Sequence, residues 1–431
     1  MNTVAKVNLW GSMVGAIAWN DASGYATFEY EPGFLKKGLD IAPITMPLDK
    51  AINENGIFSF RVLNKETYKG LPGLLADSLP DRFGNKLIES WLAQQGRDPA
   101  SFNSVERLCY TGKRGMGALE YEPVIPSITD KSGPIEINEL VKLTKEVLNE
   151  RINLKLNIHE KSNEGLLTIL RVGTSAGGNR AKAIIAYNEK TGDVRSGQID
   201  DLEGYSYWII KFDGVNDKQL GDPKGYCKIE YAYSLMAKDC GITMTECKLL
   251  EEHNRSHFMT RRFDRVGTKK LHMQTLCAIA HFDYNSAGAY SYEQAFQIMR
   301  QLKLPYGDLE ELYRRMVFNV IARNQDDHTK NISFLMEETG KWSLSPAYDL
   351  TYAYDPVNIW MKAHQMSING KRDDIARVDL TEVAKRMNIK KSNEIIDSVL
   401  DTVSKWTKYA KKADIDVLQM NMIRKVLRLK I

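Results

Sequence analysis

Eight consecutive polar residues, Asn324 to Asn331 (NQDDHTKN), separate two strongly patterned apolar segments. Between Asp308 and Arg323 the apolar residues recur at helical spacing, which predicts an amphipathic helix with Asp308 as its N-cap and Glu311 as the capping-box partner. After the polar segment, ISFLM and KWSLS flank the turn EETG and predict a β-hairpin. A polar loop is therefore expected to be held at both of its ends by buried structure.

The acids and amides of this region match the needs of phosphoryl transfer. Such a site requires a base near the attacking hydroxyl, and a carboxylate and an amide oxygen that hold Mg²⁺. Asp326 is the candidate base, and Asn331 and Asp349 are the candidate metal ligands. The order Asp, Asn, Asp, with a hairpin before the last acid, is that of protein kinase catalytic and metal-binding loops. The alternative is that the cluster is an ordinary solvated turn.

A kinase-like site also requires an upstream lysine on a strand. Lys211 follows the apolar run YWII and precedes Phe212, and buried lysines are rare unless they are paired. Glu230, near the start of the following helical segment, is a candidate ion-pair partner. The alternatives are an edge-strand lysine whose ammonium reaches solvent and a surface glutamate.

A small-residue turn, VGTSAGGNRAK, runs from Val172 to Lys182. Asn179 and Arg180 stand where a Walker loop needs Lys and Ser or Thr, which excludes a P-loop. The turn lacks G-x-G-x-x-G and does not open a helix, which excludes the dinucleotide fingerprint. What remains is a glycine loop between two strands, able to bring backbone N–H groups near phosphate, or a simple hairpin turn.

The remaining pattern predicts an α+β protein in three parts. Residues 1–60 are β-rich, and an amphipathic helix is expected to start near Asp81. The polar stretch around Gly133-Pro134 indicates a boundary, after which strand candidates at 166–172, 181–187 and 205–212 suggest a meander. The chain becomes mainly helical after Met273. The expected domains are 1–126, 127–265 and 266–431.

Composition narrows the class of protein but names no partner. The 431 residues carry 59 Lys and Arg against 55 Asp and Glu, a net charge of +4 that is too small to indicate nucleic acid. The five cysteines form no C-x-x-C pair, which favours a reducing, cytoplasmic compartment. No apolar run approaches the ~20 residues that span a bilayer, so no membrane association is expected.

Taken together and in this order, the strings VGTSAGGNRAKAII, WIIKF, RRFDR, NQDDHTKN and SPAYDL resemble the HipA family of bacterial toxin serine/threonine kinases. LPGLLADSLPDRFGN and MSINGKRDD add to the resemblance, which extends over most of the chain. It implies a two-lobed, protein-kinase-like α+β fold with an additional N-terminal α+β subdomain and a mainly helical C-terminal lobe. It also implies ATP and Mg²⁺ as cofactors.

Carried over to this chain, the resemblance makes Asp326 the catalytic base and Asn331 and Asp349 the Mg²⁺ ligands. Lys330 would offset charge on the transferred group. The nucleotide-binding residues would be Lys211, Gly177, Gly178, Lys182, His328, Arg261, Phe263 and Asp264, with the strand end at Arg261–Phe263 contacting adenine through its backbone and Asp264 near the ribose.

Ser175 occupies the position of the family's autophosphorylated serine, which predicts self-inactivation. The resemblance further implies an antitoxin partner with a helix-turn-helix domain, operator DNA bound mainly through that antitoxin, and a protein substrate in translation, such as an aminoacyl-tRNA synthetase. Two alternatives from other classes are a catalytically silent co-repressor module and a metal-dependent hydrolase using Asp326, Asp327 and His328.

The basic run Arg261, Arg262, Arg265, Lys269 and Lys270 is open to two interpretations. It resembles a nucleic-acid patch in composition. Within a hinge-and-loop segment, however, solvated surface charge is the expected state of these side chains.

Overall fold

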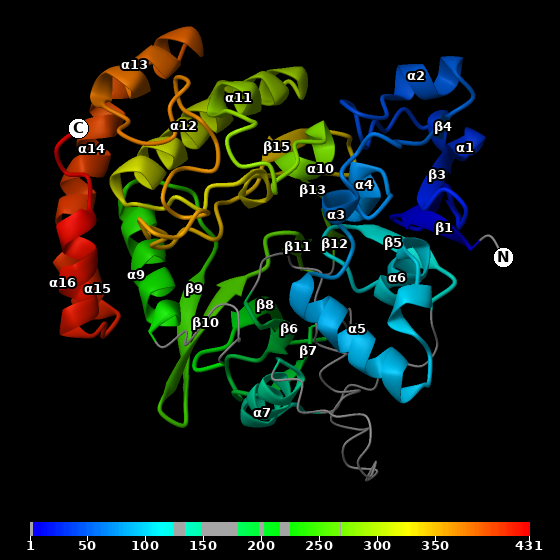
Figure 1. The fold of residues 1–431 in the computed structure, drawn as a ribbon, viewed down its shortest axis with the longest axis horizontal. Helices are drawn as coiled ribbons and strands as arrows, with labels where there is room; N and C mark the ends of the chain where they lie inside the picture. Colours follow the sequence, from blue (N-terminus) through cyan, green and yellow to red (C-terminus); the bar gives the residue numbers. More distant parts are fainter. Residues whose placement is uncertain (1–2, 125–133, 149–179, 198–201, 216–224, 268) are drawn as a thin grey trace. The chain divides into compact units, whose positions relative to one another are not determined.

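The computed structural model describes residues 3–124, 134–148, 180–197, 202–215, 225–267 and 269–431 (Figure 1). The chain forms two compact units. The first comprises Met1–Ala42, Met46–Cys227 and Lys248–Met273, and the second comprises Pro43–Thr45, Lys228–Cys247 and Gln274–Ile431.

An antiparallel sheet of five strands opens the first unit, in the order β4-β3-β2-β1-β5. Buried and exposed side chains alternate along β1 and β3, as expected for strands with one face on a core. The β-rich start predicted from the sequence is confirmed. The strands are β1 (Val4–Leu9), β2 (Ser12–Asn20), β3 (Tyr25–Tyr30), β4 (Ile57–Phe58) and β5 (Leu119–Glu122).

Short helices connect β3, β4 and β5, and the longest of them is α5 (Arg82–Gln94). Its N-cap is Asp81, whose Oδ1 accepts a hydrogen bond of 2.7 Å from the Gly84 N–H, so the helix start predicted near this residue is confirmed. The other elements are α1 (Pro32–Leu35), α2 (Leu48–Asn53), α3 (Lys65–Tyr68), α4 (Gly73–Ala76), the 3₁₀ turn η1 (Pro99–Ser101) and α6 (Ser104–Thr111).

A second five-stranded sheet of the first unit has the order β7-β6-β8-β10-β9. The predicted strands around 181–187 and 205–212 are confirmed as β6 and β8, which pair antiparallel, whereas the strand predicted at 166–172 lies outside the described residues. The elements are β6 (Lys182–Tyr187), β7 (Val194–Ser196), β8 (Ser206–Lys211), β9 (Cys247–Glu252), β10 (Arg255–Arg261), the small hairpin β11 (Arg265–Val266) and β12 (Lys269–Lys270), and the helix α7 (Ile137–Leu148).

One hydrophobic core joins this sheet to the N-terminal helices. Phe83, Leu87 and Trp91 of α5 share it with Leu140 and Val141 of α7. The sheet contributes Ala183 and Ile185 from β6, Trp208 and Ile210 from β8, and Met259 from β10. Residues from the expected first and second domains are thus buried against each other within one unit.

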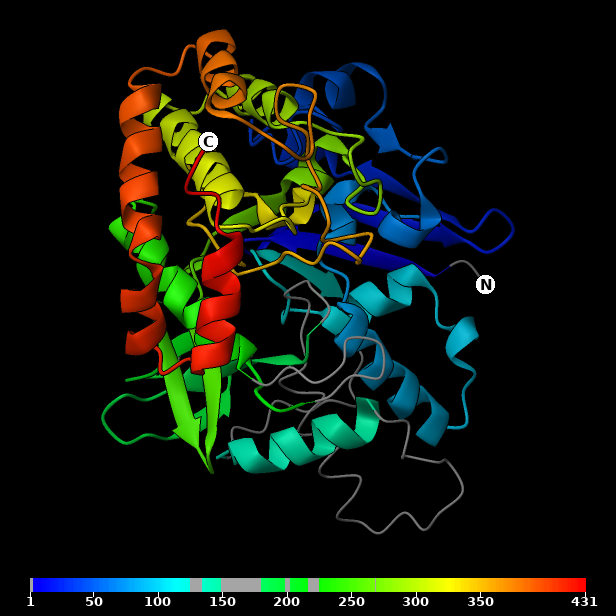
Figure 2. The same ribbon diagram turned by 60° about the vertical axis from the view of Figure 1, so that its left-hand side comes forward.

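The second unit is mainly helical, as the pattern after Met273 predicts, and it contains the hairpin β14–β15 beside β13. Helices α12 and α14 pack together, as do α15 and α16 (Figures 1 and 2). The elements that lie wholly or partly in this unit are α9 (Tyr226–Asp239), β13 (His272–Thr275), α10 (Leu276–Ala280), α11 (Tyr292–Gln301), α12 (Tyr306–Ile321), the 3₁₀ turn η2 (Thr329–Asn331), β14 (Ser333–Met336), β15 (Trp342–Leu344), α13 (Arg377–Arg386), α14 (Ser392–Ser404), α15 (Trp406–Lys412) and α16 (Val417–Val426).

The start of α12 differs from the sequence-based prediction. Its N-cap is Pro305, and Asp308 lies inside the first turn, where its Oδ2 accepts a 2.8 Å hydrogen bond from the Leu344 N–H. Glu311 accepts instead from the Thr243 N–H at 3.0 Å. The predicted capping box is wrong because both carboxylates bind backbone groups that tertiary folding brings to the helix.

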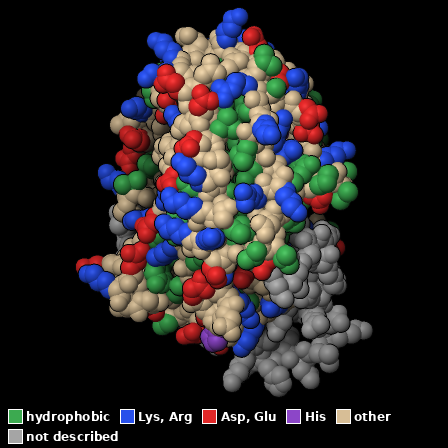
Figure 3. All heavy atoms as spheres, turned by 90° about the vertical axis from the view of Figure 1, so that its left-hand side faces the viewer, with side chains coloured by type: hydrophobic (Ala, Val, Ile, Leu, Met, Phe, Trp, Pro, Cys, Tyr) green, Lys and Arg blue, Asp and Glu red, His purple; other side chains and the backbone are tan. Residues whose placement is uncertain are grey.

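Basic side chains are exposed on the C-terminal helices, and in the view of Figure 3 Lys and Arg are mixed with Asp and Glu. Lys408, Lys411 and Lys412 lie near the exposed acids Asp414 and Asp416 in sequence. Among the described residues, no helix combines the length and apolar character needed to cross a bilayer.

The shared core makes a prediction about stability. Leu87→Ala should lower the free energy of unfolding by about 2–5 kcal/mol, because Leu87 is fully buried and its removal leaves a cavity. Val62→Ala, at a side chain that is 95% exposed, should change it by less than about 0.5 kcal/mol. Denaturant unfolding measures both, and equal effects would contradict the assignment of Leu87 to the core.

Candidate functional site

The polar segment Asn324–Asn331 follows directly on α12, as predicted. Asn324, Gln325 and Asp327 are buried, whereas Asp326 between them is exposed. Neighbouring aspartates therefore occupy opposite environments: one faces the solvent and the other faces the protein interior.

Asp327 holds this loop in place. Its carboxylate accepts hydrogen bonds from the Tyr292 hydroxyl at 2.9 Å, from the Gln365 N–H at 2.8 Å and, at 2.8 Å, from Nδ1 of His364. Burial, reinforced by the nearby Asp327 charge, keeps the pKa of Tyr292 well above its usual range, so its hydroxyl remains a donor. The loop is thereby connected to α11 and to the segment before Met366.

Asp326 and Asn331 are connected through the backbone of the same loop. The side-chain Nδ2 of Asn331 donates to the Asp326 carbonyl at 2.8 Å. Among the described residues its amide oxygen has no hydrogen-bond partner, which leaves that oxygen as a candidate ligand. His328 Nε2 lies 3.9 Å from Asp326 Oδ1.

Asn331 and Asp349 line the same small cavity of about 20 Å³, so the structure brings the two predicted metal ligands together. Asp349 has a φ of 52°, a left-handed conformation that Asp tolerates better than most residues. A carboxylate and an amide oxygen are ligands of the kind that Mg²⁺ takes in proteins, so these two residues would be able to hold that ion. Within the described part of the chain, no group of three or more His, Cys, Asp or Glu side chains could hold a metal ion.

Two residues that the sequence analysis did not single out support this cavity. Arg315 of α12 is buried and lines it, with Nε 2.9 Å from Glu311 Oε1 and Nη2 donating to the Ser345 carbonyl at 2.7 Å. Burial lowers the pKa of Arg315, although the Glu311 charge opposes this shift. Tyr348, directly before Asp349, donates to the Lys330 carbonyl at 2.6 Å and so connects the two predicted loops. In the sequence, only the spacing of four residues between Glu311 and Arg315 indicates one of these contacts, the ion pair on α12.

Lys330 is half-buried, and its ammonium lies 4.6 Å from the centre of the Tyr284 ring. Glu230 is buried on α9. Its predicted ion pair with Lys211 stays a prediction.

In the first unit, Lys211 is the last residue of β8 and is half-buried. Its backbone neighbours across the sheet are Lys182 on β6 and Phe258 on β10, and its ammonium lies 5.8 Å from the centre of the Phe258 ring.

Lys182 lies in the interior, at the start of β6. Its Nζ is 3.4 Å from Oδ2 of Asp81, and both side chains are almost completely buried. Arg180, two residues earlier, stacks its guanidinium on the Tyr226 ring at 3.9 Å. Gly177, Gly178 and Ser175 lie outside the described residues.

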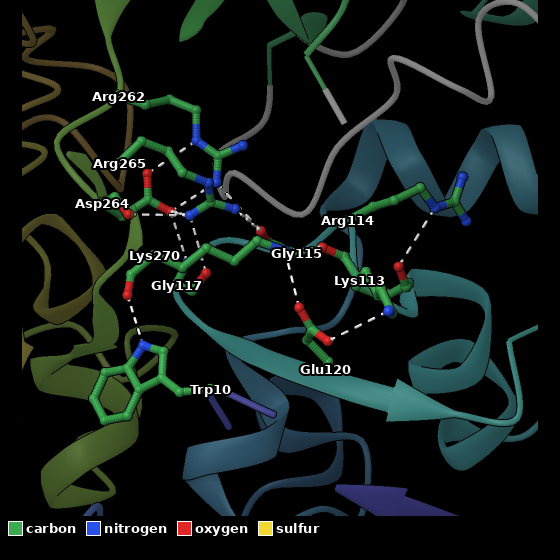
Figure 4. A network of polar contacts seen from close by, with 11 residues as sticks. Trp10, Lys113, Arg114, Gly115, Gly117, Glu120, Arg262, Asp264, Arg265 and Lys270 are labelled. Carbon is green, nitrogen blue, oxygen red and sulfur yellow. Dashed lines mark hydrogen bonds and ion pairs between the residues drawn. The ribbon is translucent and has the colours of Figure 1, made fainter. Parts of the chain in front are cut away.

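The strand end Arg261–Phe263 leads into a buried ionic network (Figure 4). Arg261 is exposed and Phe263 is half-buried, but the Asp264 carboxylate has no exposed surface. It accepts from Arg262 at 2.9 and 2.7 Å, from Arg265 at 2.8 Å and from the Gly117 N–H at 2.7 Å.

The Asp264 network overturns one expectation. The prediction that the basic run is solvated surface charge is wrong for Arg262 and Arg265, because both are paired with Asp264 in the interior. Burial alone would raise the pKa of Asp264, but the two guanidiniums and the Gly117 N–H hold it well below its usual range. The oxygens of Asp264 already accept four N–H bonds within the protein, which argues against the predicted ribose contact of this residue.

These features define an α+β protein with a polar loop and a second acid gathered at one cavity. The sequence profile of the HipA N-terminal domain matches residues 5–122, and that of the HipA-like C-terminal domain matches residues 174–407. The chain belongs to the HipA family, and the resemblance seen in its motifs is confirmed.

Relatives and a solved structure agree with this assignment. Two Sinorhizobium fredii proteins, "Putative kinase Y4mE" and "Putative kinase Y4dM", are 26% and 29% identical over 156 and 162 residues. These alignments include 33% of this chain, and the chain spans only 36% of the length of either relative.

A chain in the complex of the Shewanella oneidensis MR-1 toxin antitoxin system HipA, HipB and its operator DNA matches with a TM-score of 0.66. The identity is 15%, and the match covers 99% of this chain and 95% of that one. This confirms the α+β, HipA-like fold.

The Asp264 network predicts a specific pH dependence of stability. The pKa of Asp264 is lower in the folded than in the unfolded state. The ionised carboxylate therefore contributes its full share to the free energy of unfolding above the unfolded-state pKa of about 3.9, and this share is lost progressively as the pH falls below that value. At pH 7, Asp264→Asn should lower the free energy of unfolding by about 3–5 kcal/mol, because two buried guanidiniums lose their partner.

The difference in the free energy of unfolding between wild type and Asp264→Asn should shrink below about pH 4. Denaturant unfolding at a series of pH values measures it. A difference that stays constant down to pH 3 would contradict the proposed charge state of Asp264.

Proposed function

We propose that this HipA-family chain is an ATP- and Mg²⁺-dependent protein kinase that phosphorylates serine or threonine hydroxyls. The observation that carries the proposal is that Asn331 and Asp349 line the same cavity. Along the chain, the exposed Asp326 lies five residues before Asn331, and the β14–β15 hairpin separates Asn331 from Asp349. This is the oxygen-donor set and the acid that phosphoryl transfer requires.

In this proposal Asp326 accepts the proton of the attacking hydroxyl. Its exposure lets a substrate hydroxyl approach, while the buried neighbour Asp327 keeps the loop from moving. Asn331 and Asp349 hold Mg²⁺ through oxygen, and the bound ion supplies neutralisation of phosphate charge. Lys330 adds positive charge beside the loop, and His328 is assigned to the nucleotide.

Nucleotide-binding residues are also proposed in the first unit. Lys211 is assigned to the ATP phosphates, since it is half-buried at a strand end. The backbone at Arg261 and Phe263 is assigned to adenine, and Gly177 and Gly178 to phosphate. Lys182 is not assigned to the nucleotide, because its ammonium is paired with Asp81.

A toxin role in a toxin-antitoxin pair is supported by family membership and by the neighbour that was solved with HipB and operator DNA. We propose a helix-turn-helix antitoxin as partner, contact with operator DNA mainly through that antitoxin, and a protein substrate in translation.

The test is incubation of the purified protein with γ-labelled ATP and Mg²⁺, alone and with cell extract, followed by mass spectrometry. Label on protein serine or threonine supports the kinase. Release of free phosphate without protein label indicates a hydrolase. Absence of any turnover indicates a silent binding module, and either of these results would overturn the proposal.

Asp326→Asn should lower kcat for phosphoryl transfer by about 10²–10⁴-fold, because the proton acceptor is lost. The affinity for ATP should change little, since the carboxylate does not bind nucleotide in this scheme. Glu337→Gln, in the exposed turn between β14 and β15, is the matched control and should leave kcat unchanged. A fully active Asp326→Asn variant would rule out the base assignment.

Phosphorylation of Ser175 is proposed to inactivate the protein. A phosphate adds a charge of about −1.5 to −2 where the ATP phosphates are proposed to dock, so repulsion should weaken nucleotide binding. Calorimetric titration of ATP into Ser175-phosphorylated protein and into Ser175→Ala should show much weaker binding to the former. Equal dissociation constants would contradict self-inactivation.

A further inference from the structure

The N-terminal HipA domain contacts the second sheet of the first unit through two buried ionic contacts as well as through the shared core. We call them the β6 anchor, Asp81–Lys182, and the β10 anchor, Asp264 with Arg262, Arg265 and the backbone of Gly115 and Gly117. Asp81, Gly115 and Gly117 belong to residues 5–122, which match the N-terminal domain.

The β6 anchor lies beside Lys211. Lys182 is the backbone partner of Lys211 in the antiparallel pair of β6 and β8. Asp81 is itself rigidly placed, because its Oδ1 caps α5 by accepting from the Gly84 N–H. The next residue of the same strand end is also held, since the Phe212 N–H donates to the Ala181 carbonyl at 3.2 Å.

Figure 4 shows the β10 anchor. It lies toward the end of β8 opposite to Lys211, as the pairing of β8 with β10 shows. Arg261 pairs with Trp208, and the Arg262 N–H donates to the Tyr207 carbonyl at 2.9 Å, so this end is three or more residues from Lys211 along β8. The Arg262 guanidinium also donates to the Gly115 carbonyl at 3.3 Å, and that of Arg265 donates to the Gly117 carbonyl at 3.0 Å. Gly117 has a φ of +77°, and a Cβ there would lie 3.1 Å from the Met273 nitrogen.

Stability alone does not explain two buried ionic contacts in a sheet that already has a hydrophobic core. Desolvation of buried charges costs several kcal/mol per ion, and well-packed apolar replacements are often equally stable or more so. Ionic contacts, unlike apolar ones, require particular atoms at particular distances. Both anchors hold strand ends to which the proposed function assigns nucleotide contacts.

We propose that the N-terminal domain positions the nucleotide-binding strands, with Asp81 and Asp264 as positioning residues that act through Lys182 and through Arg262 and Arg265. This inference rests on the proposed function, because it assumes that Lys211 and the backbone at Arg261–Phe263 bind ATP. Asp81, Lys182 and Asp264 themselves contact no nucleotide.

The test compares ATP binding with folding in the full chain. Asp81→Asn keeps an N-cap residue for α5 but removes the charge, and Asp264→Asn removes the charge at the other anchor with little change of shape. Each should raise the dissociation constant for ATP with Mg²⁺ by about ten- to a hundredfold, the effect expected from a small misplacement of binding groups. Glu189→Gln, which removes the exposed pair of Glu189 with Lys248 on the same sheet, should leave the constant unchanged.

A double variant separates positioning from stability. Asp81→Asn with Lys182→Met removes both charges of the β6 anchor but keeps a capping side chain at the start of α5, so it should restore the unfolding midpoint to about the wild-type value. Its ATP dissociation constant should nevertheless stay raised by about tenfold or more. Calorimetry, carried out well below each unfolding midpoint, measures the binding.

The outcomes are distinguishable. A raised dissociation constant in a thermally restored double variant supports positioning. Binding that returns to wild-type strength whenever the midpoint is restored means that the anchors only stabilise the fold, and this overturns the inference alone. A wild-type protein that does not bind ATP overturns the proposed function, and with it the premise of the inference.

Discussion

The first unit depends on the charge balance at Asp264. A carboxylate with no exposed surface is very costly to bury unless its charge is matched and its oxygens are hydrogen-bonded. Two guanidiniums and one backbone N–H meet that need, and they come from the strand end and from the N-terminal domain. Each guanidinium also donates to a carbonyl of Gly115 or Gly117. The Asp264 carboxylate, the start of the β11–β12 hairpin and the loop at Gly115–Gly117 are therefore held together in one polar network. Loss of the Asp264 carboxylate would leave two guanidiniums without their ionic partner.

The second unit uses a similar arrangement. Asp327 is buried and fully hydrogen-bonded beside the exposed Asp326, as Asp264 is buried beside the half-buried Phe263. In both places a buried aspartate fixes the backbone whose neighbouring residue is proposed to act on substrate or nucleotide. When the buried neighbour makes the contacts that hold the loop, the exposed residue stays in position and its own polar atoms remain available for substrate or nucleotide.

Local pattern predicted much of the fold. The start of α5 at Asp81, the strands β6 and β8, and the hairpin β14–β15 follow from capping chemistry and from period-two or turn signals that lie within a few residues. The capping box at Asp308 and Glu311 was wrong, because backbone N–H groups of Leu344 and Thr243 compete for the same carboxylates. Neither partner is near α12 in the sequence.

The amino-acid order alone indicated the family and the α+β class, and it proposed the set Asp326, Asn331 and Asp349, because motifs of short range carry that information. Only tertiary structure decided which charges are buried. RRFDR looks like a solvated basic segment, yet Arg262 and Arg265 surround Asp264 in the interior, and Lys182 pairs with Asp81 about a hundred residues away. The physical reason is that the environment of a charge depends on which distant chain segments exclude water from it, and no local pattern records that.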